Sequence, residues 1–205
     1  MAKIQIKAVV FDLYETLIYK VGGSYSDDPY RTILMTAQQQ YVRGRPIFMT
    51  EDLQTLQVIA ERFGVADKVD FVKCQQELDQ RLANTFLYPE TIEVLERLKN
   101  QGLKLGVISN LSSLYRIPFY NLGLDKYFDQ KIFSCEVGLV KPQPEIYQMM
   151  VDRLGVAPSQ ILMTGDQLVI DVYPPQKAGM QAVHLDRKGE SIDSIATLEG
   201  IFKYL

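Results

Sequence analysis

The sequence predicts a three-layer α/β fold: a parallel sheet of five or more strands, helices on both of its faces, and an inserted helical segment. Short apolar runs alternate with stretches of helical periodicity, which is typical of βα units in a parallel sheet. The runs are rich in β-branched residues and continuous, as expected of strands buried on both faces. One long helical stretch, residues 21–88, interrupts the first βα unit. We therefore expect a core formed by residues 1–20 and 89–205, and a helical domain inserted at 21–88.

The apolar runs predict five strands. They are expected over residues 6–13, 103–108, 131–134, 161–164 and 181–185. The core helices are expected over residues 89–100, 113–121, 144–154 and 171–178. Gly102 and Gly155 follow two of these helices, at the position where glycine commonly ends a helix. Pro174 and Pro175 make the start of the last helix unusual, because proline lacks the N–H that a helix uses.

Three further helices are expected in the insertion. Asp28 is suited to cap the first, residues 30–43, because Pro29 then takes the first helical position. The second begins near residue 50 and ends at Gly64, and the third covers residues 67–86. Apolar residues recur at helical spacing in the second and third helices, which indicates that one face of each is buried.

The composition excludes several classes of protein. The chain has 205 residues, 47% of them hydrophobic, which is enough for one core and an insertion. The formal net charge is −3 without a basic cluster, so we expect no nucleic-acid partner. No apolar run approaches the roughly 18 residues of a membrane span, and the first residues lack the apolar core of a signal peptide. Cys74 and Cys135 have no metal-ligand spacing, so we expect reduced thiols in a cytoplasmic protein.

Polar residues follow several strands at the end where parallel sheets carry their chemistry. Asp12 ends the first predicted strand, and Ser109 and Asn110 follow the second. The other candidates are Lys141, after the third strand, and Asp166 and Asp171, after the fourth. Because the carboxyl ends of parallel strands meet at one edge of the sheet, we expect these side chains to converge.

This set of side chains suits phosphoryl transfer. Three carboxylates can converge on one Mg²⁺ ion, which prefers oxygen ligands. One of them, Asp12, can also attack phosphorus. Ser109 and Asn110 offer a hydroxyl and an amide to the phosphoryl oxygens, and the Lys141 ammonium can neutralise the charge that develops on those oxygens.

Four short motifs occur in order along the chain. They are FDLYETL at 11–17, ISN at 108–110, VKP at 140–142 with EIY at 145–147, and TGD at 164–166 with Asp171. In this combination the chain resembles the haloacid dehalogenase-like hydrolase superfamily, in the form that carries a helical cap after the first motif. The resemblance covers essentially the whole chain and implies a Rossmann-like core.

The resemblance also implies roles for individual residues. Asp12 would be the nucleophile, and Ser109 and Lys141 would hold the reacting group and its developing charge. Thr16 and Asn110 are counted with the phosphate-binding residues. The ligands of Mg²⁺ would be the carboxylates of Asp12, Asp166 and Asp171 and the backbone carbonyl of Tyr14.

Tyr14 departs from the phosphatases that the chain resembles. They carry a second Asp here, which protonates the leaving oxygen and then activates water; such acid–base help is worth about 10²–10⁴-fold. A phenol with a pKa of ~10 is a poor base at neutral pH. Dehalogenating members carry Tyr here and need no metal, and the Arg that follows their first motif would be Arg43 or Arg45. The pair Asp166 and Asp171, however, has the metal-binding form found in phosphatases.

Three functions therefore stay open. The first is a Mg²⁺-dependent phosphohydrolase that acts through an aspartyl-phosphate on a small phosphorylated metabolite, with Tyr14 in place of the acid/base and good leaving groups favoured. The second is a 2-haloacid dehalogenase, and the third is a member that binds a ligand without catalysis. A monomer or homodimer with no membrane or nucleic-acid partner is expected. Glu15 points to the wrong side of an extended segment to replace the acid, and His184 is expected to be structural.

Overall fold

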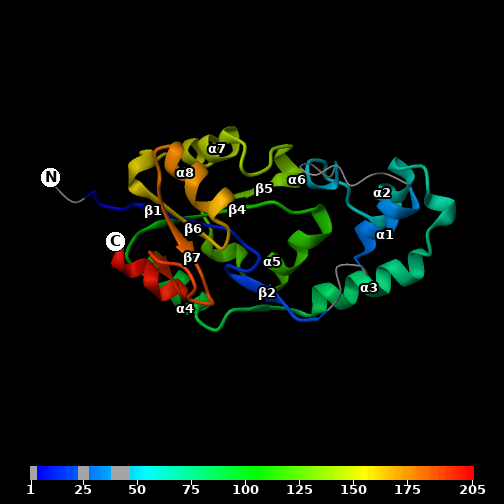
Figure 1. Cartoon of the computed structure of the whole chain (residues 1–205), viewed down its shortest axis with the longest axis horizontal. Helices are drawn as coiled ribbons and strands as arrows, with labels where there is room; N and C mark the ends of the chain where they lie inside the picture. Colours follow the sequence, from blue (N-terminus) through cyan, green and yellow to red (C-terminus); the bar gives the residue numbers. More distant parts are fainter. Residues whose placement is uncertain (1–3, 23–27, 38–46) are drawn as a thin grey trace.

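A parallel sheet forms the centre of the computed structural model, which describes residues 4–22, 28–37 and 47–205. Within these residues the sheet has six strands in the order β5-β4-β1-β6-β7-β8, and Figure 1 shows it between the helices of the core. The strands are β1 (Ala8–Phe11), β4 (Lys104–Ser109), β5 (Gln130–Phe133), β6 (Ile161–Gly165), β7 (Gln181–Leu185) and β8 (Ser194–Ile195). The predicted fold class is confirmed, and β8, two residues long, was not predicted.

The central strand β1 carries the first motif to the middle of one sheet edge. It pairs in parallel with β4 on one side and with β6 on the other, so that Phe11 lies opposite both Val107 and Thr164. The N–H of Asp12 extends this pairing by donating to the carbonyl of Thr164 at 3.0 Å. The carboxyl ends of the three strands therefore reach the same edge of the sheet.

Helices cover both faces of the sheet, and β1 is buried between them. Val9 and Phe11 belong to one apolar cluster and Ala8 and Val10 to another, as expected of successive side chains in a strand. The first cluster includes residues of α4 (Thr91–Asn100), α5 (Ile117–Asn121) and the 3₁₀ segment Leu198–Lys203. The second includes residues of α7 (Pro144–Leu154), with α8 (Tyr173–Lys177) on the same face (Figure 1). The three predicted layers are therefore present.

The insertion forms a group of helices at one end of the molecule (Figure 1). Its helices are α1 (Pro29–Thr36), α2 (Leu56–Arg62) and α3 (Phe71–Ala83), and they share an apolar cluster of their own. The antiparallel pair of β2 (Ile18–Lys20) and β3 (Thr85–Leu87) connects the insertion to the core. The side chain of Asp28 accepts the N–H of Tyr30 at 3.0 Å, so Asp28 caps α1 as predicted.

Several helix boundaries differ from the prediction, and polar caps explain two of them. Thr55 caps α2 by accepting the N–H of Val58, and Asp70 caps α3 by accepting the N–H of Lys73. These helices therefore begin at Leu56 and Phe71, later than predicted. The predicted third helix also ran through residues 85–86, which belong to β3. The structure describes α1 as far as Thr36, and residues 38–46 lie outside the described part.

Prolines account for differences in the core helices. The predicted helix at 171–178 is a π-helix over Leu168–Val172 followed by α8, because neither Pro174 nor Pro175 can donate an N–H to the turn before it. The predicted helix at 113–121 is a 3₁₀ segment, Ser113–Arg116, followed by α5, whose second residue is Pro118. A short helix, α6 (Ser134–Val137), follows β5 and was not predicted. The remaining 3₁₀ segments are Ile47–Met49, Ala66–Lys68, Asp125–Tyr127 and Pro158–Gln160.

Two expectations from composition agree with the described residues. Cys74 and Cys135 are both buried free thiols. Among the helices of the described part of the chain, none combines the length and the apolar character that crossing a membrane requires.

Candidate active site

The end of β1 places Asp12 beside a buried lysine. The ammonium of Lys141 lies 2.6 Å from Oδ1 of Asp12 and 2.7 Å from Oδ1 of Asp171. The side chains of Lys141 and Asp171 are fully buried, and that of Asp12 is 9% exposed. One ammonium therefore bridges two carboxylates from different segments, since Asp12 follows β1 and Asp171 lies in the π-helix Leu168–Val172. The sequence predicted this convergence from the strand ends alone.

Asp166 completes a group of three carboxylates. One oxygen from each of Asp12, Asp166 and Asp171 lies within 4.8 Å of the others. Among the residues that the structure describes, Oδ1 of Asp166 is buried without a hydrogen-bond partner, whereas Oδ2 of Asp171 accepts the N–H of Gln167 at 3.2 Å. A buried carboxylate oxygen without a partner is costly unless a cation or donor meets it. The donor set and this oxygen both fit a hard divalent cation.

Burial and neighbouring charges shift the pKa values of Asp12, Asp166 and Lys141. Burial raises the pKa of Asp12 to about 7; the charge of Asp171 adds to this effect and the Lys141 ammonium opposes it. Burial, together with the charge of Asp171, also raises the pKa of Asp166. Burial by itself would lower the pKa of Lys141, but the two adjacent carboxylates outweigh it, so that pKa is raised and the ammonium is retained. Within the described part of the chain, the Lys141 ammonium is thus left to balance three carboxylates, which favours a second cation at this point.

Asn110 holds the backbone that carries Lys141. Its Oδ1 accepts the N–H of Lys141 at 2.7 Å, and its Nδ2 donates to the carbonyl of Lys141 at 2.8 Å. Both ends of the amide are therefore engaged with one residue, which fixes the lysine next to Asp12. The sequence analysis predicted that Asn110 binds phosphoryl oxygens. With one amide N–H donated to Lys141, the second N–H is the group that remains for this contact.

Thr16 of the first motif and Ser109 of the second are both buried. Oγ1 of Thr16 is buried and has no hydrogen-bond partner among the described residues. Ser109 is the last residue of β4 and is 2% exposed. Tyr147, part of the third motif, donates to the carbonyl of Ile170 and thereby supports the segment that carries Asp171.

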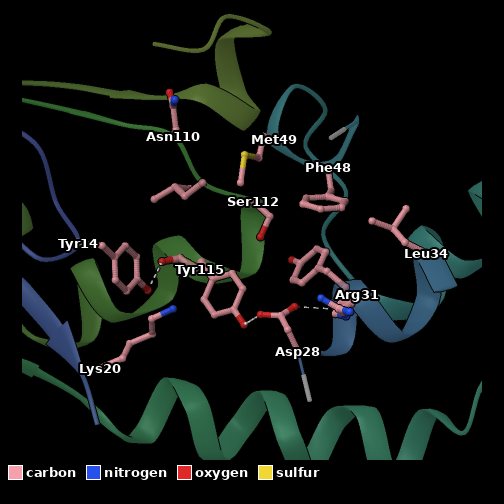
Figure 2. Close-up of a pocket in the computed structure, with 12 residues that line it drawn as sticks. Tyr14, Lys20, Asp28, Arg31, Leu34, Phe48, Met49, Asn110, Ser112 and Tyr115 are labelled. Carbon is pink, nitrogen blue, oxygen red and sulfur yellow. Dashed lines mark hydrogen bonds between the residues drawn. The ribbon is translucent and has the colours of Figure 1, made fainter. Parts of the chain in front are cut away.

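The hydroxyl of Tyr14 is hydrogen-bonded to a backbone carbonyl and not to one of the three carboxylates. It donates to the backbone carbonyl of Tyr115 at 2.8 Å (Figure 2). Burial raises the pKa of Tyr14 above its ordinary value, and the neighbouring Tyr30 adds to the effect. The phenol therefore keeps its proton at neutral pH and donates it in a hydrogen bond to a carbonyl. It does not fit the role of a general base.

A cavity of about 260 Å³ lies between the core and the insertion, next to Tyr14. Figure 2 shows the side chains around it, which come from both sides. Its lining consists of Tyr14, Lys20, Asp28, Tyr30, Arg31, Leu34, Phe48, Met49, Asn110, Leu111, Ser112 and Tyr115. Tyr14 belongs to the first motif and Asn110 to the second, so the cavity is bordered by the same motifs that carry Asp12 and Ser109.

Other candidates have different surroundings. Glu15 has a positive φ of 59° and its Oε2 accepts the hydroxyl of Tyr88 at 3.2 Å, which is a different direction from that of Tyr14. Nε2 of His184 lies 2.9 Å from the backbone carbonyl of Asp166, in agreement with a structural role. Arg43 and Arg45 lie outside the described residues.

Arg187 is a contributor that sequence reasoning missed. Its guanidinium donates to the carbonyl of Thr16 and to Oε1 of Glu90, both at 2.7 Å, and it lies 3.3 Å from the centre of the Tyr88 ring. It therefore ties the first motif to the chain segment that returns from the insertion. A single arginine after the last predicted strand has no spacing or motif that could have revealed this role.

Gly165 is required by the close approach of Asp171. A Cβ at this position would lie 2.4 Å from both Cγ and Oδ2 of Asp171. We expect Gly165→Ala to displace this carboxylate, with a loss of about 1–3 kcal/mol in stability and about 10–100-fold in kcat/KM. Thermal unfolding and steady-state assays measure the two effects.

Gly106→Ala is the matched control for this prediction. A Cβ at Gly106 would also be crowded, 2.8 Å from Sδ of Met150, but this neighbour is a flexible side chain remote from the carboxylates. We expect a smaller change in stability and little change in kcat/KM. Equal losses of activity in the two variants would show that Gly165 has no specific relation to the site.

Comparisons with known proteins agree with this geometry. The sequence model of the family described as haloacid dehalogenase-like hydrolase matches residues 6–179. A glyceraldehyde 3-phosphate phosphatase of Methanopyrus kandleri is 34% identical over 110 residues, which are 53% of this chain and 47% of that enzyme. The chain thus matches less than half of the length of this relative.

Solved structures resemble the chain over nearly its whole length. A HAD phosphatase from Thermococcus onnurineus superimposes with a TM-score of 0.65 at 26% identity, covering 97% of each chain. A 2-haloacid dehalogenase from Pseudomonas syringae pv. Tomato superimposes with a TM-score of 0.68 at 23% identity, covering 98% of each chain. The second likeness, at this identity, concerns the fold alone.

Proposed function

Because the chain belongs to the haloacid dehalogenase-like hydrolases, we propose that it is a Mg²⁺-dependent phosphohydrolase that acts through Asp12 on a small phosphorylated metabolite. The observation that carries the proposal is the group of three converging carboxylates with the Lys141 ammonium, in which Oδ1 of Asp166 has no partner among residues 4–22, 28–37 and 47–205. A dianionic phosphate needs positive charge around it, and of the described side chains Lys141 is the cation paired with these carboxylates, which is too little charge beside three acidic groups.

Lys141 and the carboxylates define the reaction that we propose. Lys141 holds Oδ1 of Asp12, which leaves Oδ2 to attack phosphorus. The new bond from Asp12 to phosphorus forms as the bond to the leaving oxygen breaks, and that oxygen departs with the electron pair and takes a proton from water. A second water then attacks phosphorus, the electron pair returns to the Asp12 carboxylate, and the water proton passes to solvent. The products are an alcohol or phenol and inorganic phosphate.

Mg²⁺ would be held by Asp12, Asp166, Asp171 and the backbone carbonyl of Tyr14. When bound, the ion supplies positive charge to the phosphoryl oxygens. Thr16 and Ser109 would donate hydroxyl hydrogen bonds to the same oxygens, and Asn110 would act by holding Lys141 in place.

We also propose a division of the chain into a core of residues 1–20 and 89–205 and a cap of residues 21–88. The apolar cluster shared by α1, α2 and α3 supports this division, as does the two-stranded connection through β2 and β3. The cavity between the two parts gives the cap a place to contact the leaving group.

The experiment that tests the proposal is a metal-dependent assay with p-nitrophenyl phosphate. We expect release of p-nitrophenol with Mg²⁺, loss of activity with excess EDTA, and recovery when Mg²⁺ is restored. The thermal unfolding temperature should rise with Mg²⁺, because a cation that binds only the folded chain stabilises it. Activity that is equal in Mg²⁺ and in EDTA would contradict the metal part of the proposal.

A 2-haloacid dehalogenase is the second candidate, and Tyr14 is the observation that favours it. The ion pairs from Lys141 to Asp12 and Asp171 also place positive charge at the nucleophile without a metal. The same protein is therefore assayed for halide release from 2-chloropropionate in EDTA. Halide release in EDTA together with no phosphatase activity in Mg²⁺ would replace the first proposal with this one.

A further inference from the structure

Lys20 brings a cation to the cavity beside Tyr14. It is the last residue of β2, and its ammonium lies 5.3 Å from the centre of the Tyr14 ring and 5.3 Å from that of Tyr115. The two rings are perpendicular, with centres 6.3 Å apart, so they hold the ammonium at a defined place. Figure 2 shows Lys20 directed toward the cavity and Tyr115. Within residues 4–22, 28–37 and 47–205, no carboxylate pairs with it.

On the proposed function, the cavity is the space that the leaving group of a substrate at Asp12 would enter, because Tyr14, two residues after Asp12, lines it. Tyr14 and Asn110 border it on the core side, and Tyr30, Leu34 and Phe48 border it on the side of the insertion. Apolar and aromatic walls suit a hydrocarbon or aromatic body. The Lys20 ammonium adds a place for one negative charge at the edge of that body.

We propose that Lys20 determines specificity by pairing with a carboxylate on the leaving group of the substrate. This inference rests on the proposed phosphohydrolase function and names its substrate class: phosphate monoesters whose leaving group carries a carboxylate. A second phosphate is disfavoured, because the lining holds two cationic side chains, Lys20 and Arg31, and one carboxylate, Asp28, and this net charge of +1 matches a monoanion better than a dianion. Asp28 is itself held by the N–H of Tyr30 at 3.0 Å and by the hydroxyl of Tyr115 at 2.6 Å.

A pair of substrates tests the charge alone. 4-Carboxyphenyl phosphate and its amide analogue, 4-carbamoylphenyl phosphate, have similar shapes and differ in charge at the distal end. We expect the wild type to prefer the carboxylate in kcat/KM, and Lys20→Gln to reduce this preference by about fivefold, the effect of one partly exposed ion pair. Lys20→Arg should retain most of the preference. A preference that Lys20→Gln leaves unchanged overturns the proposal.

Two controls separate Lys20 from its neighbours and from net charge. Lys177→Gln removes an equal charge from the exposed end of α8 and should leave the preference unaltered. Arg31→Gln removes the other cation of the cavity lining and should reduce the preference less than Lys20→Gln does. A fall of the same size in Lys177→Gln, or a larger fall in Arg31→Gln, contradicts the assignment to Lys20.

Calorimetric binding of benzoate and benzamide keeps this test independent of turnover. We expect Lys20→Gln to weaken benzoate binding by about fivefold and to leave benzamide binding as it is. If the wild type hydrolyses no phosphate ester, the proposed function fails, and this calorimetric difference still decides the role of Lys20. Benzoate binding that is equal in the wild type and in Lys20→Gln overturns that role.

Discussion

Asp12→Asn is expected to reduce the hydrolysis of p-nitrophenyl phosphate by about 10³-fold or more, because it removes the nucleophile. The amide nitrogen of Asn cannot form an aspartyl-phosphate, and the remaining oxygen still accepts the Lys141 hydrogen bond now made at 2.6 Å. Steady-state assays with Mg²⁺ measure the loss. Rapid quenching of the wild type with a labelled phosphate ester should trap phosphorus on the protein, and the variant should trap none.

The stability of this variant provides its control. The substitution removes one of three neighbouring carboxylates, two of whose pKa values are raised by burial and mutual repulsion. We therefore expect the unfolding temperature without Mg²⁺ to be equal to or higher than that of the wild type, and the increase on adding Mg²⁺ to be smaller. Asp152→Asn, which removes a carboxylate from α7, should change neither activity nor the response to Mg²⁺. Turnover by Asp12→Asn at the wild-type rate would show that another group attacks phosphorus, and inactivity of the wild type itself would favour the ligand-binding alternative.

The convergence at this site could be predicted from the sequence because it depends on the backbone. Asp12 directly follows a continuous apolar run, and Asp166 ends another, so the parallel register of β1 and β6 was enough to bring them together. The same reasoning gave the residues of β7 and α7 without error, because their apolar periods end at clear turn residues.

Features that depend on the direction of a side chain could not be predicted in this way. The pair Ser109 and Asn110 has the composition of a turn. Only the structure shows that the side chain of Asn110 forms two hydrogen bonds with the backbone of Lys141. The strands β2 and β3 have three residues each, too few for a period to be recognised. Lys20, at the end of β2, therefore had no context from which its place between two tyrosine rings could be inferred.

Tyr14→Asp is expected to increase the hydrolysis of alkyl phosphates by about 10²-fold, at the lower limit of what a general acid–base supplies. The wild-type phenol donates to the carbonyl of Tyr115, and burial raises its pKa, so it gives the leaving oxygen no proton and cannot activate water. The wild-type rate should therefore depend steeply on the basicity of the leaving group. Tyr14→Asp should flatten this dependence, with a large gain for ethyl phosphate and a small gain for p-nitrophenyl phosphate, measured as kcat/KM over a series of esters.

Two further substitutions of Tyr14 distinguish an effect of acid–base chemistry from an effect of side-chain size. Tyr14→Asn has the size of Asp without its titration, so it should give no gain with ethyl phosphate. Tyr14→Phe keeps the ring beside Lys20 and Tyr115 and loses only the hydrogen bond to the Tyr115 carbonyl, so its rate should stay close to that of the wild type. If Tyr14→Asp and Tyr14→Phe both lose activity, the tyrosine hydroxyl takes part in the reaction itself. That result, combined with halide release from 2-chloropropionate, would assign the site to carbon–halogen chemistry.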